Sequence, residues 1–243
     1  MMRVEGLRKT FGAIVAVDAI SFTAQDGMVT GLLGPNGAGK TTTIRALSGI
    51  ARPDAGDVRV DDIDVVADPR GGCRRLGVLP EAVGLYDRLT AREHLHYAGA
   101  LHGLRGADLR RRSEEAIARL GLERFADRKT GSLSFGQRRR VALARALVHE
   151  PANVILDEPT NGLDVTGTRQ TRTEIRRLAS EGHAVILSSH VMPEVAATCD
   201  RIIVLARGRV AANGTPDEIL AATRCSMLED AFVRLIGTDE GLN

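Results

Sequence analysis

The chain has 243 residues, of which 43% are hydrophobic and 26% are charged. These proportions are ordinary for a globular protein with a buried core and exclude a collagen-like or wholly disordered chain. Thirty-three basic and 31 acidic side chains leave a formal net charge of +2. The chain therefore lacks the large positive charge that is typical of dedicated nucleic-acid-binding proteins.

The sequence predicts no membrane-spanning segment. The longest stretch without Asp, Glu, Lys or Arg is the glycine-rich segment 27–39, which is too short to cross a bilayer. The first residues lack the apolar core and cleavage site of a secretory signal, so we expect the chain to stay in the cytoplasm. Cys73, Cys199 and Cys225 form no Cys-x-x-Cys pair, so we expect reduced structural cysteines rather than disulfides or a zinc site.

The N-terminal third shows mainly β-type patterns. Runs rich in Val, Ile and Leu at 14–22 and 28–33 predict two strands separated by a turn at 25–27. A glycine-rich loop follows, and then a helical stretch to about residue 50. Beyond a turn at 53–56, Val and Ile alternate with Asp and Arg over 58–66, which predicts one half-buried strand.

The remainder alternates helices with apolar runs. Capping-box patterns, in which two side chains satisfy the first free N–H groups, predict helices beginning after Thr90 and Thr215, and a further helix covers 110–121. Apolar runs at 154–156, 184–187 and 202–205 predict buried strands, with a helical segment between the first two. This order predicts a parallel sheet covered on both faces, interrupted by an all-helical insert.

A phosphate-binding motif lies at 34–41. Its sequence fits G-x-x-x-x-G-K-[ST], with a strand before it and a helix after it. The backbone N–H groups would surround the phosphates, Lys40 would supply a positive charge, and Thr41 would offer a hydroxyl to Mg²⁺. A plain glycine turn is the alternative, but it explains neither the lysine nor the hydroxyl.

Two carboxylates end the apolar strand at 154–156. Asp157 is a candidate Mg²⁺ ligand, and Glu158 is a candidate base that orients or deprotonates a water attacking the γ-phosphate. The alternative is a solvated acidic pair at a strand end. A GTPase is excluded by the absence of Asn-Lys-x-Asp, since the chain has lysines only at positions 9, 40 and 129.

The segment 133–137 reads Leu-Ser-Phe-Gly-Gln, and here the chain resembles the ATP-binding-cassette (ABC) ATPases, whose signature is Leu-Ser-Gly-Gly-Gln. The resemblance extends from about residue 3 to 220. Ser134 and Gln137 also fit a capping box, so a helix begins there with N–H groups suited to a phosphate. Phe135 replaces the usual glycine, and its ring either crowds the phosphate or packs outward against a partner chain. We predict that the three arginines at 138–140 form a solvated helical face rather than a nucleic-acid contact.

This resemblance implies an α/β fold of the P-loop NTPase class, an ABC cassette with a RecA-like core, an N-terminal antiparallel β part and an α-helical insert. A single ABC ATPase domain would cover 1–220, and a C-terminal helical tail would cover 221–243. Within the domain, 1–81 and 151–220 would form the α/β core with its β part. Residues 82–150 would form the helical signature subdomain.

The resemblance also assigns roles to individual residues. Phe11 aligns with the aromatic that stacks on adenine, Asp164 with the loop that communicates across a dimer, and His190 with the histidine that contacts the γ-phosphate. Glu81 stands where the family usually has glutamine near Mg²⁺. The expected ligands are ATP and Mg²⁺, with Glu158 and His190 as catalytic residues and Thr41, Glu81 and Asp157 as metal ligands. The predicted nucleotide-binding residues are Phe11, Asn36, Gly37, Ala38, Gly39, Lys40, Thr41, Thr42, Ser134, Gly136, Gln137 and Asp164.

The segment 81–93 resembles cassettes of the sodium-extrusion group, which pair with separate integral-membrane permeases, often for export. The expected partners are therefore a permease, docked near Tyr86, Asp87 and Arg88, and a second cassette in a homodimer or heterodimer. No nucleic acid is expected, and the chain would be peripheral on the inner face of the cell membrane. A soluble ABC ATPase acting on a ribosome, DNA or another complex is the alternative. It is not favoured, because the chain has one cassette, no charged linker and no heptad run.

Overall fold

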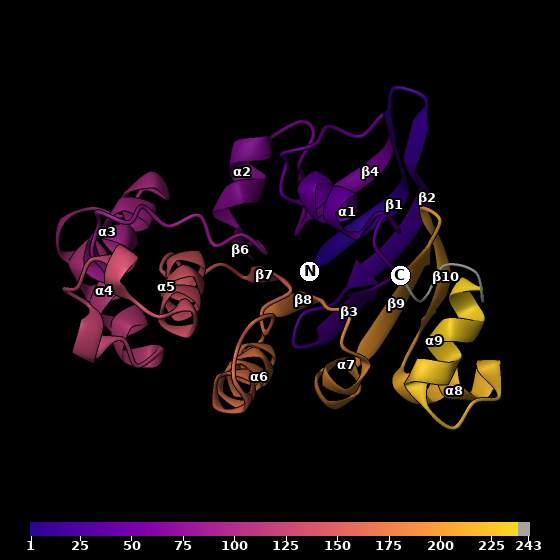
Figure 1. Ribbon diagram of the computed structural model, residues 1–243. Coiled ribbons are helices and arrows are strands. Elements are labelled where there is room, and N and C mark those ends of the chain that lie inside the picture. The colour runs from indigo at the N-terminus through magenta and orange to yellow at the C-terminus, as the bar shows by residue number, and fades with distance from the viewer. Residues whose placement is uncertain (238–243) are drawn as a thin grey trace.

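The computed structural model describes residues 1–237, and the last six residues of the predicted C-terminal tail, 238–243, lie outside the described part. Two sheets form the centre of the molecule (Figure 1). The first is antiparallel with the order β2-β1-β4-β5, and the second has the order β10-β9-β3-β8-β7-β6. In the second sheet β9, β3, β8, β7 and β6 run parallel, and β10 pairs antiparallel with β9 at the edge.

The strands of the first sheet are β1 (Met2–Phe11), β2 (Ile14–Ala24), β4 (Ala55–Val60) and β5 (Ile63–Asp64). Those of the second are β3 (Val29–Leu33), β6 (Leu76–Leu79), β7 (Asn153–Asp157), β8 (Ala184–Ser188), β9 (Arg201–Ala206) and β10 (Arg209–Gly214). The apolar runs predicted as strands at 14–22, 28–33, 154–156, 184–187 and 202–205 are confirmed. The single strand predicted over 58–66 is wrong, because Asp61 takes a positive φ of 54° and turns the chain back between β4 and β5.

Each face of the parallel sheet has its own core. Val154 and Leu156 of β7 face one cluster of buried side chains, and Ile155 between them faces the other. This alternation follows from the two-residue period of a strand. Because both faces are covered, every residue of β3, β7 and β8 is buried, as the continuous apolar runs predict.

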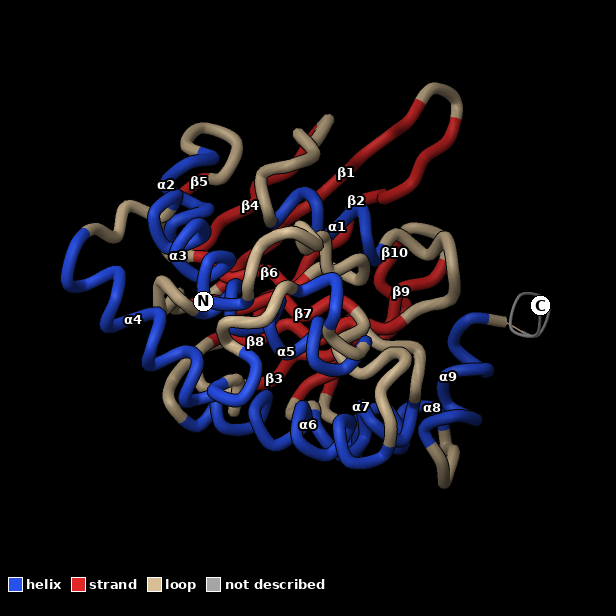
Figure 2. Tube along the Cα trace, turned by 60° about the vertical axis from the view of Figure 1, so that its left-hand side comes forward, coloured by secondary structure: helices blue, strands red, loops and turns tan. Residues whose placement is uncertain are grey.

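Helices cover the sheets in separate groups (Figures 1 and 2). Helix α1 (Lys40–Leu47) contacts β1 and β4, while α6 (Val165–Ser180) and α7 (Met192–Thr198) lie along the opposite face of the parallel sheet. To one side stand α3 (Ala91–Leu101), α4 (Gly106–Arg119) and α5 (Phe135–Leu147), with short 3₁₀ turns at Glu123–Phe125 and Thr130–Ser132. The remaining helices are α2 (Pro69–Arg74), α8 (Pro216–Thr223) and α9 (Leu228–Ile236).

All three predicted capping boxes are present. Thr90, Ser134 and Thr215 each accept a hydrogen bond from the backbone N–H three residues later, and the side chain at that position accepts one in return. Helices α3, α5 and α8 therefore begin where the sequence predicts. The domain boundary predicted at residue 220 falls inside α8, and the division into subdomains stays a prediction.

The three cysteines carry free thiols. Cys199 is packed against Gly31, where an added Cβ would lie 2.9 Å from its sulfur, and burial raises the pKa of this thiol to about 12. Among the described residues, no helix is long and apolar enough to cross a bilayer.

Candidate nucleotide-binding site

Four parallel strands end at the same edge of the sheet, and each delivers one part of the site. The glycine-rich loop follows β3, Asp157 and Glu158 lie at the end of β7, His190 follows β8, and Glu81 follows β6. Open α/β sheets bind ligands at this carboxyl edge. The loop ends enclose a cavity of about 580 Å³, and its lining includes seven of the predicted site residues: Asn36, Lys40, Thr41, Glu81, Asp157, Glu158 and His190.

The phosphate loop leaves backbone N–H groups at the start of α1 without a side-chain cap. Gly39 occupies the N-cap position with a φ of 104°, and a Cβ there would lie 2.8 Å from the backbone oxygen of Ala16. Only glycine fits both the backbone angle and this close approach. The uncapped N–H groups and the positive end of the helix dipole make this turn a site for an anion.

Lys40 lies across the loop that carries it. Its Nζ donates to the carbonyl oxygens of Gly34 at 2.5 Å and Pro35 at 3.2 Å. Burial lowers the pKa of Lys40, and the negative charges of Glu158, Asp157 and Glu81 oppose that shift. The ammonium thus lies near the carboxylates of the same cavity, where an incoming phosphate would give it a stronger partner.

Asp157 and Glu158 are almost buried, at 7% and 8% exposure. The Ser188 hydroxyl donates to the Asp157 carboxylate, and the N–H of Glu158 donates to the carbonyl of Ser188 at 3.1 Å. The Glu158 Oε2 lies 2.9 Å from Nδ1 of His190, whose side chain is 62% exposed. Glu158 also has a φ of 48°, an unfavourable angle for a residue with a side chain. The arrangement presents an oriented carboxylate toward the cavity.

Arg139 is a site residue that the sequence prediction missed. The solvated face expected for 138–140 is wrong at this position, because Arg139 is only 4% exposed. Its guanidinium donates to the backbone oxygens of Pro159 at 2.7 Å and Glu81 at 3.2 Å. The signal was helix phase: Arg139 precedes the buried Ala142 and Leu143 by three and four residues, which places it on the core face of α5.

The neighbouring arginines have different surroundings. Arg138 donates to Asp87 at 2.6 Å, and the Arg140 guanidinium lies 5.3 Å from the centre of the Phe125 ring. Both are partly exposed. The solvated face that the sequence predicts therefore describes Arg138 and Arg140 better than it describes Arg139.

The signature segment lines a second cavity of about 460 Å³. Its lining includes Ser134, Phe135, Gly136, Gln137 and Asp164. Among the described residues, the two cavities share no lining residue. One chain therefore presents its phosphate loop and its signature segment at separate places.

Within this second cavity, Phe135 lies against its own chain. A Cβ on Gly162 would lie 2.8 Å from the Phe135 ring, and 52% of Phe135 remains exposed. Asp164 caps α6 by accepting a hydrogen bond from the N–H of Gly167 at 2.7 Å. The signature and the segment before α6 thus form one continuous surface.

Some predicted residues do not line the phosphate cavity. Phe11 ends β1, is 51% exposed and has the Lys9 ammonium 5.5 Å from its ring centre, but it does not line the cavity. Its stacking on adenine stays a prediction. Of the other predicted residues outside this lining, Gly37, Ala38, Gly39 and Thr42 belong to the phosphate loop and the start of α1, and Ser134, Gly136, Gln137 and Asp164 line the second cavity.

Comparison with known proteins decides the family. The family model described as ABC transporter matches residues 17–161. The chain belongs to this family. The resemblance inferred from the signature and the predicted fold class are both confirmed, and the chain is an ATP-binding subunit of the ABC transporter type.

Relatives of known name agree. The chain is 39% identical over 221 residues to the ABC transporter ATP-binding protein NatA of Bacillus subtilis, covering 90% of each chain. It is 38% identical to the Nod factor export ATP-binding protein I of Ralstonia nicotianae, covering 90% of this chain and 68% of the relative. It is 37% identical to the Fe(3+) ions import ATP-binding protein FbpC of Agrobacterium fabrum, covering 93% of this chain and 64% of the relative.

Solved structures show the same fold. An ATP-binding subunit of an ABC transporter superimposes with a TM-score of 0.90 at 29% identity, covering 98% of this chain and all of the other. The cassette MJ0796, solved as a dimer in a post-hydrolysis state with ADP and phosphate, gives a TM-score of 0.80 at 27% identity over 88% of this chain and 98% of its own. The family and this product-bound structure identify the chain as an ATPase.

Proposed function

We propose that this chain binds Mg-ATP at the phosphate cavity and pairs with a second cassette, with each nucleotide held between the phosphate loop of one chain and the signature of the other. We further propose that it drives a separate membrane permease in export. The separation of the two cavities on one chain is the observation that carries the proposal. A single chain does not bring its own signature N–H groups to its own phosphate loop.

The phosphate cavity has the oxygen ligands that Mg²⁺ requires. The Thr41 hydroxyl and the carboxylates of Asp157 and Glu81 line it together. Among the described residues, no three or more His, Cys, Asp or Glu side chains are placed to hold a metal ion together, so phosphate oxygens and water would complete the shell. Such partial protein ligation is typical of Mg²⁺ sites. When bound, Mg²⁺ would offset the charge that develops on the transferred phosphoryl group.

The other residues of the site would bind the phosphates, accept the proton and complete the site from the second cassette. Lys40 and the N–H groups of the loop would bind the β- and γ-phosphates. Glu158 would accept a proton from the attacking water, and His190 would hold the Glu158 carboxylate in place through their 2.9 Å contact. In the second cassette, Ser134 and Gly136 would present the N-terminal N–H groups of α5 to the γ-phosphate, which completes the site electrostatically.

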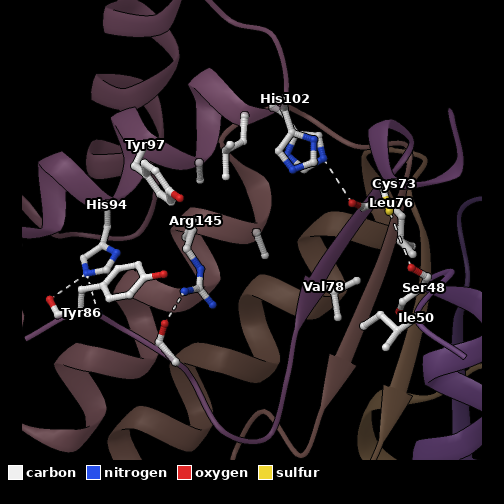
Figure 3. Close-up of a pocket in the computed structure, with 15 residues that line it drawn as sticks. Ser48, Ile50, Cys73, Leu76, Val78, Tyr86, His94, Tyr97, His102 and Arg145 are labelled. Carbon is white, nitrogen blue, oxygen red and sulfur yellow. Dashed lines mark hydrogen bonds between the residues drawn. The ribbon is translucent and has the colours of Figure 1, made fainter. Parts of the chain in front are cut away.

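An apolar groove of about 410 Å³ supports permease docking (Figure 3). It lies between the end of α1, helix α3 and helix α5, so its occupant would touch both the core and the helical region. Around it Ile50, Tyr86 and Leu101 are 74%, 60% and 70% exposed, an unusual gathering of uncovered large apolar side chains. A short amphipathic helix from the permease fits such a groove.

The direction of transport and the location rest on the relatives. The resemblance of segment 81–93 to the sodium-extrusion group and the relative named for Nod factor export favour export, although the relative FbpC is named for import. Docking to a permease would place the chain on the inner face of the membrane. A role on a non-transport complex is not favoured by these relatives.

The shared site is tested by turnover per chain over a wide dilution series at saturating Mg-ATP, with light scattering alongside. We expect specific activity to rise with protein concentration and then to level off, because dimer forms from two chains. Mixing Lys40→Ala with Ser134→Arg should restore activity that neither variant has alone, since one composite site then keeps both parts. Constant specific activity in samples shown to be monomeric would contradict the shared site.

Docking is tested with cysteine chemistry. Cys73 is exposed and lines the groove, so maleimide labelling of Cys73 should fall when the permease is co-purified. In a Cys73→Ser background, Tyr86→Cys should cross-link to the permease, whereas Asp62→Cys, in the turn after β4, should not. Cross-linking from position 62 but not from position 86 would place the permease on another face.

A further inference from the structure

Arg139 forms the main polar link between the signature helix and the catalytic segment. It lies on α5 five residues after Ser134, and its side chain reaches the end of β7. Besides its bonds to Pro159 and Glu81, the guanidinium donates to the backbone oxygens of Asp157 at 3.3 Å and of Glu158. One side chain therefore binds two backbone segments that line the phosphate cavity, one after β6 and one at the end of β7.

Burying this charge costs free energy, and nearby carboxylates offset part of that cost. Burial lowers the pKa of Arg139, and the charges of Glu158, Glu81 and Asp157 oppose the shift. A buried cation is tolerated only when its N–H groups are paired. Here they are paired with main-chain oxygens rather than carboxylates, so the carboxylates of Glu158 and Asp157 remain available to the cavity.

The backbone that Arg139 holds is an unfavourable one. Glu158 has a φ of 48°, and such angles persist only where surrounding contacts fix them. The bond from the Glu158 N–H to Ser188 fixes one side of this residue, and Arg139 binds its carbonyl on the other. Loss of the guanidinium would leave the peptide after Glu158 without that contact.

We propose that Arg139 is a positioning residue that fixes the Glu158 backbone and couples it to the signature end of α5. This coupling rests on the proposed shared site: a nucleotide of the partner bound at Ser134 would shift α5, and Arg139 would pass that shift to the base of the chain's own site. Arg139 touches neither reacting atoms nor nucleotide in this arrangement.

The shape of the side chain suggests the variants. Arginine offers a planar fork of five donors, whereas lysine offers one compact ammonium and glutamine one amide. Arg139→Lys keeps the charge but cannot bind all of these carbonyls together, and Arg139→Gln loses the charge as well. Arg119→Gln is the matched control, because Arg119 is a partly buried arginine of the helical region that pairs with Glu174 and Glu181 instead.

The experiment measures ATP affinity without turnover, kcat at saturating Mg-ATP, and amide hydrogen exchange. We expect Arg139→Gln to lower kcat by about tenfold or more, as a misplaced catalytic group does, while ATP affinity changes by less than about threefold. Arg139→Lys should fall between the glutamine variant and the parent. Exchange at Glu158 and Asn161 should quicken, while β8 keeps its protection. Arg119→Gln should leave kcat unchanged.

Three results would overturn the proposal. The first is a kcat of Arg139→Gln within twofold of the parent. The second is a loss of kcat that tracks a loss of ATP binding and faster exchange throughout the chain, which would mean a merely structural role. The third result would be used if Arg139→Gln does not fold: it is that Arg139→Lys keeps the kcat and the hydrogen exchange of the parent. Failure of the proposed shared site can be distinguished from failure of the Arg139 proposal, because the dilution series that tests the shared site uses only the parental chain.

Discussion

Replacing Glu158 with glutamine isolates the proposed proton acceptor. The amide has nearly the same size as the carboxylate, and Glu158 is only 8% exposed, so the change removes an acceptor oxygen without opening a cavity. The side chain contacts His190 at 2.9 Å, and the backbone contacts of Glu158 with Arg139 and Ser188 do not involve the carboxylate. Because Glu158 is a negative charge near Lys40, its removal should leave the affinity for anionic ATP equal or slightly higher.

The expected loss is in turnover. A positioned general base contributes about 10²–10⁴-fold, which corresponds to about 3–5 kcal/mol of barrier. We therefore expect Glu158→Gln to lower kcat by that factor at saturating Mg-ATP and to accumulate as an ATP-bound dimer in gel filtration. Glu181→Gln, at a position paired with Arg119 and Arg177, is the control and should keep parental turnover. Parental turnover in Glu158→Gln would show that another group takes the proton.

Three further predictions concern the loop and the groove. Lys40→Ala should lower nucleotide affinity, turnover or both by more than tenfold in equilibrium binding and turnover assays, and near-parental values for both would contradict the phosphate-loop assignment. Gly39→Ala should weaken ATP binding more than Gly37→Ala. Both glycines have a positive φ, but only at Gly39 would a Cβ lie 2.8 Å from the Ala16 backbone oxygen. Equal losses of affinity in ATP titrations would contradict the steric argument. Burial lowers the pKa of His149 from 6.5 to about 4, so between these pH values the unfolded chain binds a proton that the folded chain does not. The free energy of unfolding should therefore fall by up to about 3 kcal/mol as the pH drops from 6.5 to about 4. Denaturant melts of the parent should show this loss, and melts of His149→Phe should not.

The sequence predicts those parts of the fold that local patterns determine. Strands β3, β7 and β8 are buried on both faces, so each leaves a continuous apolar run. The capping boxes need only four neighbouring residues. In contrast, the sequence does not predict β1, because Arg3, Glu5, Arg8 and Lys9 interrupt its apolar positions. This segment forms a strand through its pairing with β2 and β4, which no local pattern records.

The same distinction applies to the site. Lys40, Asp157 and Glu158 lie within recognisable motifs, and the order of the strands brings them together. Arg139 looks like its two neighbours in the sequence, and only the phase of α5 and the packing of that helix separate it from them. Phe232 and Ile236 also line the phosphate cavity, but they come from α9, whose position depends on tertiary packing that no local motif records.

The order of the strands explains why His190 lies in the phosphate cavity beside Glu158. Strand β8 lies between β3, which carries the phosphate loop, and β7, which carries Asp157 and Glu158. Ser188 pairs with Asp157 in the β7–β8 register and binds both its carboxylate and the N–H of Glu158. His190 follows two residues later, where the next turn of the chain faces the cavity. A substitution that shifts β8 would therefore move the carboxylates and the histidine together, so the geometry of the site depends on the sheet as much as on the loops.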